Sequence, residues 1–340
     1  MNYKNYALTI LLASLFILAP LSSPYAADKP IQLSYANFFP PTHIQAKLGQ
    51  QWINEIEKRT NNRVKITYYP GGALLKGDKI FGGILDGITD IGMSVPAYTR
   101  GRFPALEAIP LPMGYPSGMV STLVINDFAK KFKPKELNKV KVMYLHAHGP
   151  GLLHTKKPVR KLEDVKGLKI RAQGFTAKVV EAIGGVPVAM PQGGTYEALQ
   201  KGVCEGTISP MEVLKGWKQG EVIKYTTLCY GISYAAGFYV FMNLDKWKAL
   251  PKDIQKVFDE VSSEWIVKHA EAWDASDEEG RKFTLGLGNE IIPLSKEENA
   301  RWAKNAQGAI DMYVKQTEKL GLPAKEYVAT IRELIEKHSK

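Results

Sequence analysis

Apolar and polar residues alternate along many short stretches of the first 240 residues, as they do in β-strands with one buried face. Turn residues close several of these stretches, for example Pro70-Gly71-Gly72 after RVKITYY. Strands are therefore predicted at IQLSYANFF, RVKITYY, ITDIGMSV, KVKVMYLHA, VKGLKIRA, VPVAM, EGTISP, YTTLCYGIS and GFYVFMN.

Stretches with a helical spacing of apolar residues separate these strands. After the first strand, apolar residues recur every four positions from Ile44 to Ile56, which predicts an amphipathic helix. Thr42 and Gln45 together predict a capping box at its start. Thr176 is the predicted N-cap of a second helix, in FTAKVVEAIGG.

The alternation of strands and helices over the first 200 residues predicts an α/β fold with largely parallel sheets and right-handed crossovers. After Pro251 the chain is charged on one side and apolar on the other, which predicts long amphipathic helices. Ligands of α/β folds bind where loops leave the carboxyl ends of strands. Arg171 lies at such an end in GLKIRAQG, and so do Ser94 to Tyr98, His146 to Gly151, and Ser209-Pro210.

The first 27 residues have the pattern of a secretory signal peptide. Lys4 precedes the apolar run YALTILLASLFILAP, and the small residues of LSSPYAAD offer a cleavage point near Ala26 or Ala27. The run is short for a transmembrane span, and an uncleaved membrane anchor is the alternative. We therefore expect a mature protein that is exported to the periplasm.

The length and charge of the chain limit the number of domains and the kinds of partner only broadly. Its 340 residues, 45% of them hydrophobic, suffice for two domains or two lobes. The formal net charge of +11 falls to +10 once Lys4 leaves with the signal peptide. Cations are scattered, often beside Glu or Asp, and no basic stripe interleaves with aromatic residues, so nucleic-acid binding is not expected. The positive charge is compatible with two kinds of partner, an anionic membrane surface and anionic ligands.

Motifs for catalysis and for cofactors are absent from the sequence. It has no G-x-S-x-G, no H-E-x-x-H, no P-loop and no complete G-x-G-x-x-G, so neither an enzyme nor a cofactor is expected. His146 and His148 face the same side of a predicted strand without an evident third ligand, so no metal site is expected. Cys204 and Cys229 leave two alternatives open, a disulfide or two buried free thiols.

Six collinear stretches carry a family pattern. They are YPGGAL, GITDIGM, YTRGRFP, LHAHGPGLLHTKKPVRKLEDVKGLKIR, MPQGGTYEALQKGVCEGTISPME and GFYVFMNLDKWKALP. In this order they resemble the solute-binding proteins of TRAP (tripartite ATP-independent periplasmic) transporters, the DctP-like family. The resemblance implies a two-lobed, periplasmic-binding-protein-like α/β fold with hinge strands and a long bracing helix. It assigns residues 28–150 plus about 238–275 to lobe I, and residues 151–237 plus about 276–340 to lobe II.

The resemblance also implies ligand contacts, residue by residue. Arg171 matches the family Arg that pairs with a ligand carboxylate, a role that suits the planar guanidinium. Ser209 stands where the family often has Asn, and Glu205 where it often has Asp. Glu212 is either an acceptor for a ligand hydroxyl or amine, or a surface residue at a helix start. Gln173 either binds the ligand or stabilises the strand end.

Two further features bear on the ligand. Many members carry a second Arg where this chain has Gly149-Pro150-Gly151, which favours a monocarboxylate over a rigid dicarboxylate. Aromatic residues cluster at the predicted loop ends, where some of them serve core packing. Tyr98, Phe39 and Phe238 are the ligand contacts expected among them, together with His148. The wider aromatic cluster adds Phe38, Trp217 and Tyr234.

The implied function is capture of a small organic acid by hinge closure. A monomer would deliver it to a small and a large TRAP membrane subunit. The alternatives are a receptor for another importer or for chemotaxis and an exported enzyme on the same scaffold.

Overall fold

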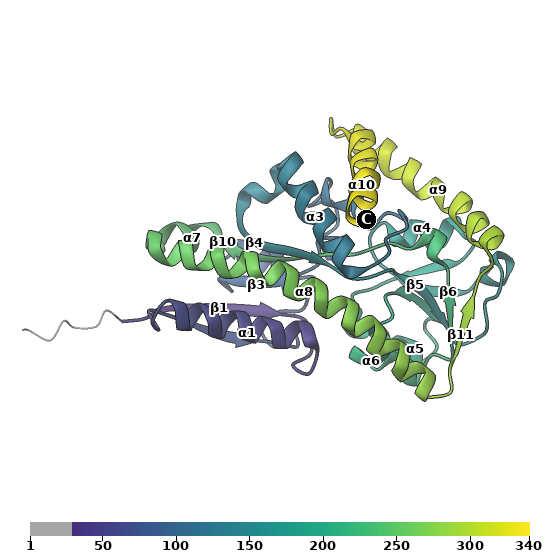
Figure 1. Ribbon diagram of the computed structural model, residues 1–340, viewed down its shortest axis with the longest axis horizontal. Helices are drawn as coiled ribbons and strands as arrows, with labels where there is room; N and C mark the ends of the chain where they lie inside the picture. The colour runs from purple at the N-terminus through teal and green to yellow at the C-terminus, as the bar shows by residue number, and fades with distance from the viewer. Residues whose placement is uncertain (1–28) are drawn as a thin grey trace, which may run out of the picture.

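The computed structural model describes residues 29–340 (Figure 1). The predicted signal peptide, residues 1–27, lies outside the described residues. Two β-sheets lie side by side, and helices flank both of them (Figure 1). One long helix, α8 (Lys252–Gly286), runs along both sheets. The architecture is therefore the predicted mixed α/β, two-lobed fold.

The first sheet is formed by the N-terminal part of the chain and one returning strand. Its strands are β1 (Ile31–Asn37), β2 (Val64–Tyr69), β3 (Ile91–Ser94), β4 (Val140–Ala147) and β10 (Gly237–Asn243), in the order β2-β1-β3-β10-β4. β1 pairs in parallel with β2 and β3, as strands linked by helical crossovers do. β10 returns from the second sheet and pairs antiparallel with β3 and β4.

The second sheet also contains both parallel and antiparallel pairs, because one of its strands enters from the first sheet. Its strands are β5 (Leu152–Thr155), β6 (Lys169–Ala172), β7 (Val186–Ala189), β8 (Gly206–Ser209), β9 (Tyr225–Leu228) and β11 (Glu290–Pro293), in the order β11-β9-β5-β8-β6-β7. β5 enters from the first sheet and runs antiparallel to β8 and β9, whereas the pairs β6–β7, β6–β8 and β9–β11 are parallel. The expectation of largely parallel sheets missed these crossing strands, which enter each sheet from the other.

Helices cover the sheets and connect them. Besides α8, the α-helices are α1 (Ile44–Arg59), α2 (Ile80–Leu85), α3 (Gly118–Phe132), α4 (Thr176–Ala182), α5 (Thr195–Gln200), α6 (Val213–Gly216), α7 (Leu244–Ala249), α9 (Lys296–Glu318) and α10 (Ala324–His338). α8 contacts α1, α3 and β4 of the first sheet region and α6 and β11 of the second. Its 35 residues correspond to a length of about 50 Å, long enough to brace both. The lobe boundaries given above stay a prediction.

Two predicted helix starts were wrong in detail. α1 is capped by His43 and not by Thr42, because Nδ1 of His43 accepts a hydrogen bond from the backbone N–H of Gln45. Thr176 is the first residue of α4 and does not cap it, since its hydroxyl bonds with the backbone of Gln173 instead. In both cases the backbone turn before the helix determines where the helix begins, so the residue type alone did not predict its first residue.

The two cysteines are free and buried. The register explains why they do not meet: Thr155 of β5 pairs with Gly206 of β8 on one side and with Tyr225 of β9 on the other. Cys204 precedes Gly206, whereas Cys229 follows β9, so the thiols lie near opposite ends of β5. Disulfide geometry requires a Cα separation below about 7 Å, which this arrangement does not give.

Candidate functional site

One cavity has walls from both sheets. Its empty volume is about 320 Å³, a figure that includes space open to solvent. The loops that follow β1, β3 and β4 supply one wall, and the ends of β6 and β8 supply the other. The residues that line it are Phe38, Phe39, Val95, Tyr98, His148, Arg171, Gln173, Gln192, Ser209, Pro210, Glu212, Val213, Trp217, Tyr234 and Phe238. All eight predicted ligand contacts are among them, although their role in binding stays a prediction.

Arg171 is buried at this cavity with only 2% of its surface exposed. Nε and Nη2 donate to the backbone oxygen of Met190 at 3.1 and 3.0 Å, and Nη2 also donates to Oε1 of Gln173 at 3.2 Å. Within residues 29–340 the hydrogen bonds of Arg171 go to a backbone oxygen and an amide oxygen, and no carboxylate forms an ion pair with it. A buried guanidinium without a counter-ion is costly, so the cavity is suited to an anion.

The polar groups near Arg171 are ordered by the protein itself. Gln173 accepts from the guanidinium and helps to fix it, whereas its predicted contact with a ligand stays a prediction. The Ser209 hydroxyl donates to the backbone oxygen of Ile208 at 2.7 Å and lies 2.9 Å from the Thr207 hydroxyl. Burial raises the pKa of Tyr98, and the positive charge of Arg171 opposes that rise. Tyr98 therefore stays a neutral phenol beside the cation.

His148 contributes its ring face and no free nitrogen. Nδ1 donates to the backbone oxygen of Gly149 at 2.6 Å, and Nε2 accepts from the N–H of Ala236 at 3.0 Å. Burial lowers the pKa of His148 to about 4, so the ring is neutral at physiological pH. His146 lies outside the cavity lining and stacks on His269 with ring centroids 4.2 Å apart. In the part of the chain that the structure describes, no group of three or more potential ligands is placed to hold a metal.

Aromatic rings form most of the apolar lining. Phe38 stacks on Phe39 at 4.3 Å, on Trp217 at 6.2 Å and on Phe238 at 6.4 Å between ring centroids. Phe38 follows a strand of the first sheet, whereas Trp217 follows α6 near the second sheet, so flat apolar surfaces face the cavity from both walls. Such a lining suits a ligand with a planar or apolar body.

Two lining residues carry unpaired donors, and one of them, Gln192, was not among the residues that the sequence analysis named. Nε2 of Gln192 and Nε1 of Trp217 are buried and have no hydrogen-bond partner in the described part of the chain. Gln192 lies in the family stretch MPQGGTYEAL, which was the only available signal for it. Unpaired buried donors favour a ligand with hydrogen-bond acceptor atoms.

Glu212 is the only acidic residue that lines the cavity within residues 29–340. It is buried, contrary to the alternative of a surface residue, and lies at the N-cap position of α6. Its backbone N–H donates to Oδ1 of Asp277 on α8 at 2.8 Å. Burial raises the pKa of Asp277 well above its usual range, and the hydrogen bond from Glu212 opposes that rise.

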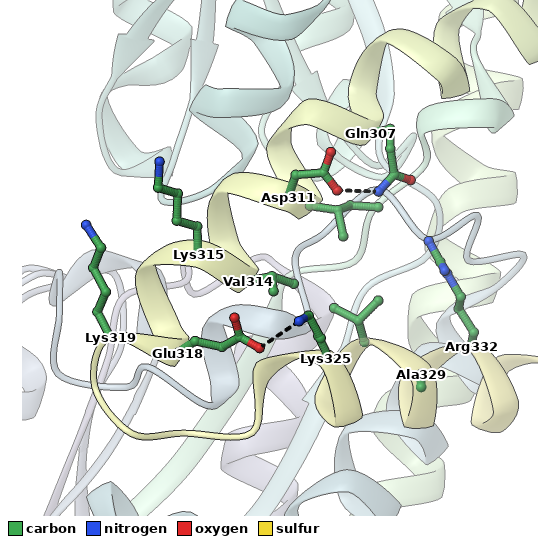
Figure 2. Close-up of a pocket in the computed structure, with 11 residues that line it drawn as sticks. Gln307, Asp311, Val314, Lys315, Glu318, Lys319, Lys325, Ala329 and Arg332 are labelled. Carbon is green, nitrogen blue, oxygen red and sulfur yellow. Dashed lines mark hydrogen bonds and ion pairs between the residues drawn. The ribbon is translucent and has the colours of Figure 1, made fainter.

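A larger hollow, with an empty volume of about 1230 Å³, lies between α9 and α10 (Figure 2). Its charged side chains are exposed at the surface, and Glu318 pairs with Lys325 while Asp311 accepts from Gln307 (Figure 2). No buried ion lines it, so we assign the functional site to the smaller cavity with Arg171.

Comparison with known proteins assigns the chain to a family. The model of the bacterial extracellular solute-binding proteins, family 7, also called DctP, matches residues 35–317. The chain belongs to this family. Within residues 29–340, no helix is both long and apolar enough to cross a membrane.

Individual members of family 7 resemble the chain over most of its length. A monocarboxylate 2-oxoacid-binding periplasmic protein of Nostoc sp. is 26% identical over 76% of this chain and 72% of its own. A TRAP periplasmic solute-binding protein of Desulfovibrio salexigens is 32% identical, with a TM-score of 0.79 over 90% of this chain and 96% of its own. A marine metagenome TRAP protein specific for aromatic acids, solved with 3-hydroxybenzoate, is 28% identical, with a TM-score of 0.87 over 92% of this chain and 100% of its own.

Membership of family 7 fixes the general activity. The protein is a solute-binding protein of the TRAP type and not an enzyme. Proteins of this family are periplasmic, bind small molecules and work with membrane components.

Proposed function

We propose that the protein captures a small organic monocarboxylate by closing its two lobes around Arg171. The observation that carries the proposal is the buried guanidinium without a carboxylate partner in the described residues. A ligand carboxylate would accept from the guanidinium and supply the missing counter-ion. Pairing is strongest in a closed, water-poor cavity, so ligand binding and closure are coupled.

The lining favours one carboxylate over two. Arg171 is the only Lys or Arg that lines the cavity within residues 29–340. Gly149-Pro150-Gly151, where many family members have a second Arg, adds no cation. A second ligand carboxylate would meet Glu212 or apolar rings and would therefore be disfavoured.

The rest of the ligand is proposed to be planar and to carry a hydroxyl or keto oxygen. Phe38, Phe39 and Trp217 offer ring faces to it, and Gln192 offers an unpaired donor. Glu212 would accept from a ligand hydroxyl. The similarity to the aromatic-acid protein solved with 3-hydroxybenzoate supports this ligand class.

In this proposal a monomeric periplasmic protein delivers the acid to a small and a large membrane subunit. Export by the predicted signal peptide would bring it to that compartment. A receptor for another importer or for chemotaxis would use the same site, and co-purification with the two membrane subunits would separate these functions.

The direct test is a thermal-shift screen of the mature protein against organic acids, including benzoate, 3-hydroxybenzoate, mandelate and 2-oxoacids. Binding at 100 times Kd stabilises by about 2.7 kcal/mol and is expected to raise Tm by roughly 5 °C. Dicarboxylates are expected to give smaller shifts. Absence of a shift with every acid would contradict the proposed function.

A further inference from the structure

A contact between the two sheet regions joins His43, which packs behind the cavity lining, to Glu212, which lines the cavity. His43 lies just after β1 of the first sheet, and Glu212 lies just after β8 of the second. Nε2 of His43 and Oε2 of Glu212 are 2.9 Å apart, and the two side chains are only 1% and 4% exposed. The bond therefore connects the two walls beside the proposed ligand.

The position of His43 at the start of α1 decides which of its nitrogens carries the proton. Nδ1 accepts a hydrogen bond from the backbone N–H of Gln45 at 3.2 Å, as an N-cap side chain does. A ring nitrogen that accepts cannot itself carry a proton, so the proton of the neutral ring is on Nε2. Nε2 therefore donates to the Glu212 carboxylate, and such a charge-assisted bond is stronger than one between neutral groups.

The surroundings of this pair hold both partners in place. The His43 ring packs on Phe39 with centroids 4.5 Å apart and on Trp217 at 5.8 Å, and both of these rings line the cavity. Room for the bond depends on Gly216, since a Cβ there would come within 2.7 Å of both Oε2 of Glu212 and Nε2 of His43. A side chain at that position of α6 would separate the pair.

We propose that His43 is a positioning residue for ligand recognition. From the opposite wall it orients the Glu212 carboxylate, which then accepts from a hydroxyl on the bound acid. Because the bond requires the two walls to meet, it stabilises the closed, liganded state. Contacts of this kind act mainly on the dissociation rate. This inference rests on the proposed function.

Two substitutions separate the two bonds of His43. Asn is a preferred N-cap, so His43→Asn is expected to keep the cap of α1, but its side chain is too short to reach Glu212. Gln extends further and carries an amide N–H that can donate to Glu212, but it is not a preferred N-cap. His43→Gln is therefore expected to keep the bond to Glu212 and to weaken the cap.

The experiment measures Kd and the dissociation rate for 3-hydroxybenzoate, or for the tightest acid of the screen, together with ligand-free stability. His43→Asn is expected to weaken binding about 10- to 100-fold through faster dissociation, and to lose less ligand-free stability than His43→Gln, since both lose the ring packing but only His43→Gln also loses a preferred cap. His43→Gln is expected to bind within about threefold of the wild type, at reduced stability. Gly216→Ala should resemble His43→Asn, whereas Gly308→Ala, where a Cβ meets nothing within 4 Å, should bind normally.

Wild-type affinity in His43→Asn would overturn the inference while leaving the proposed function intact. Equal losses of affinity in His43→Asn and His43→Gln would also overturn it, because the loss would then not follow the bond to Glu212, which only His43→Asn removes. Failure of the wild-type protein to bind any acid would instead reject the proposed function.

Discussion

The backbone N–H of Gln192 donates a 3.0 Å hydrogen bond to the phenolic oxygen of Tyr98. Tyr98 follows β3 of the first sheet, and Gln192 follows β7 of the second, so this bond also joins the two walls. Burial raises the pKa of Tyr98, which keeps the phenol neutral. The two walls are thus held together by polar contacts between loops, as well as by the stacked rings.

Tyr98→Phe is expected to weaken binding of the proposed acid roughly 3- to 10-fold, because one hydrogen bond between the walls is lost. Titration calorimetry measures the change. Tyr196→Phe is the matched control, since its hydroxyl donates to Glu221 at 3.0 Å away from the cavity. Equal affinities for Tyr98→Phe and the wild type would show that this bond does not contribute to closure.

Arg171→Met is expected to abolish binding, and Arg171→Lys to weaken it at least about 100-fold, because Lys lacks the planar fork. Ligand-free stability of Arg171→Met should equal or exceed that of the wild type, since an uncompensated buried cation is removed. Thermal shifts with and without ligand measure both effects. Arg160→Lys, at an exposed ion pair with Glu290, is the control. Retained binding in Arg171→Met would refute the assignment.

Acid is expected to destabilise the protein through its buried histidines. Nε2 of His154 donates to the backbone oxygen of Ser209 at 3.0 Å, and burial lowers its pKa to about 4. Burial lowers the pKa of His148 to about 4 and that of His269 to about 3. Unfolded histidine titrates near 6.5, so between about pH 6.5 and pH 4 the unfolded chain binds more protons, and stability falls as the pH falls.

The contribution of one such histidine is roughly 3 kcal/mol between pH 7 and pH 4. The raised pKa of Asp277 acts in the opposite sense, because it favours the folded state as the pH falls. His154→Gln should therefore show a shallower loss of stability with acid than the wild type, measured by denaturant unfolding at pH 7.5, 6 and 5. An unchanged slope would mean that His154 is already charged in the folded protein.

The buried thiols are expected to be unreactive in the native protein. Burial raises the pKa of Cys229 to about 12 and also raises that of Cys204, so little thiolate forms at neutral pH. Thiol titration should detect two thiols after denaturation and far less before it. A Tm that falls on addition of a reductant would contradict the free thiols.

Local sequence patterns were enough to predict much of the fold and several site residues. The alternation in GLKIRAQG predicted a strand that ends near Arg171, and β6 covers Lys169–Ala172. The family resemblance pointed to Ser209, and the ends of predicted strands pointed to Tyr98 and Phe39; all three line the same cavity as Arg171. Strand periodicity and turn residues are local properties, which is why they can be read along the chain.

The tertiary structure decided the relationships that local pattern does not encode. The pairing of β5 with both β8 and β9 kept Cys204 and Cys229 apart. The approach of the two walls brought His43 to Glu212 and Tyr98 to Gln192, partners that lie 169 and 94 positions apart. Sequence determined which residues stand at the ends of strands. Only packing of the two sheets determined which of those ends face each other, because that depends on contacts between segments far apart in the chain.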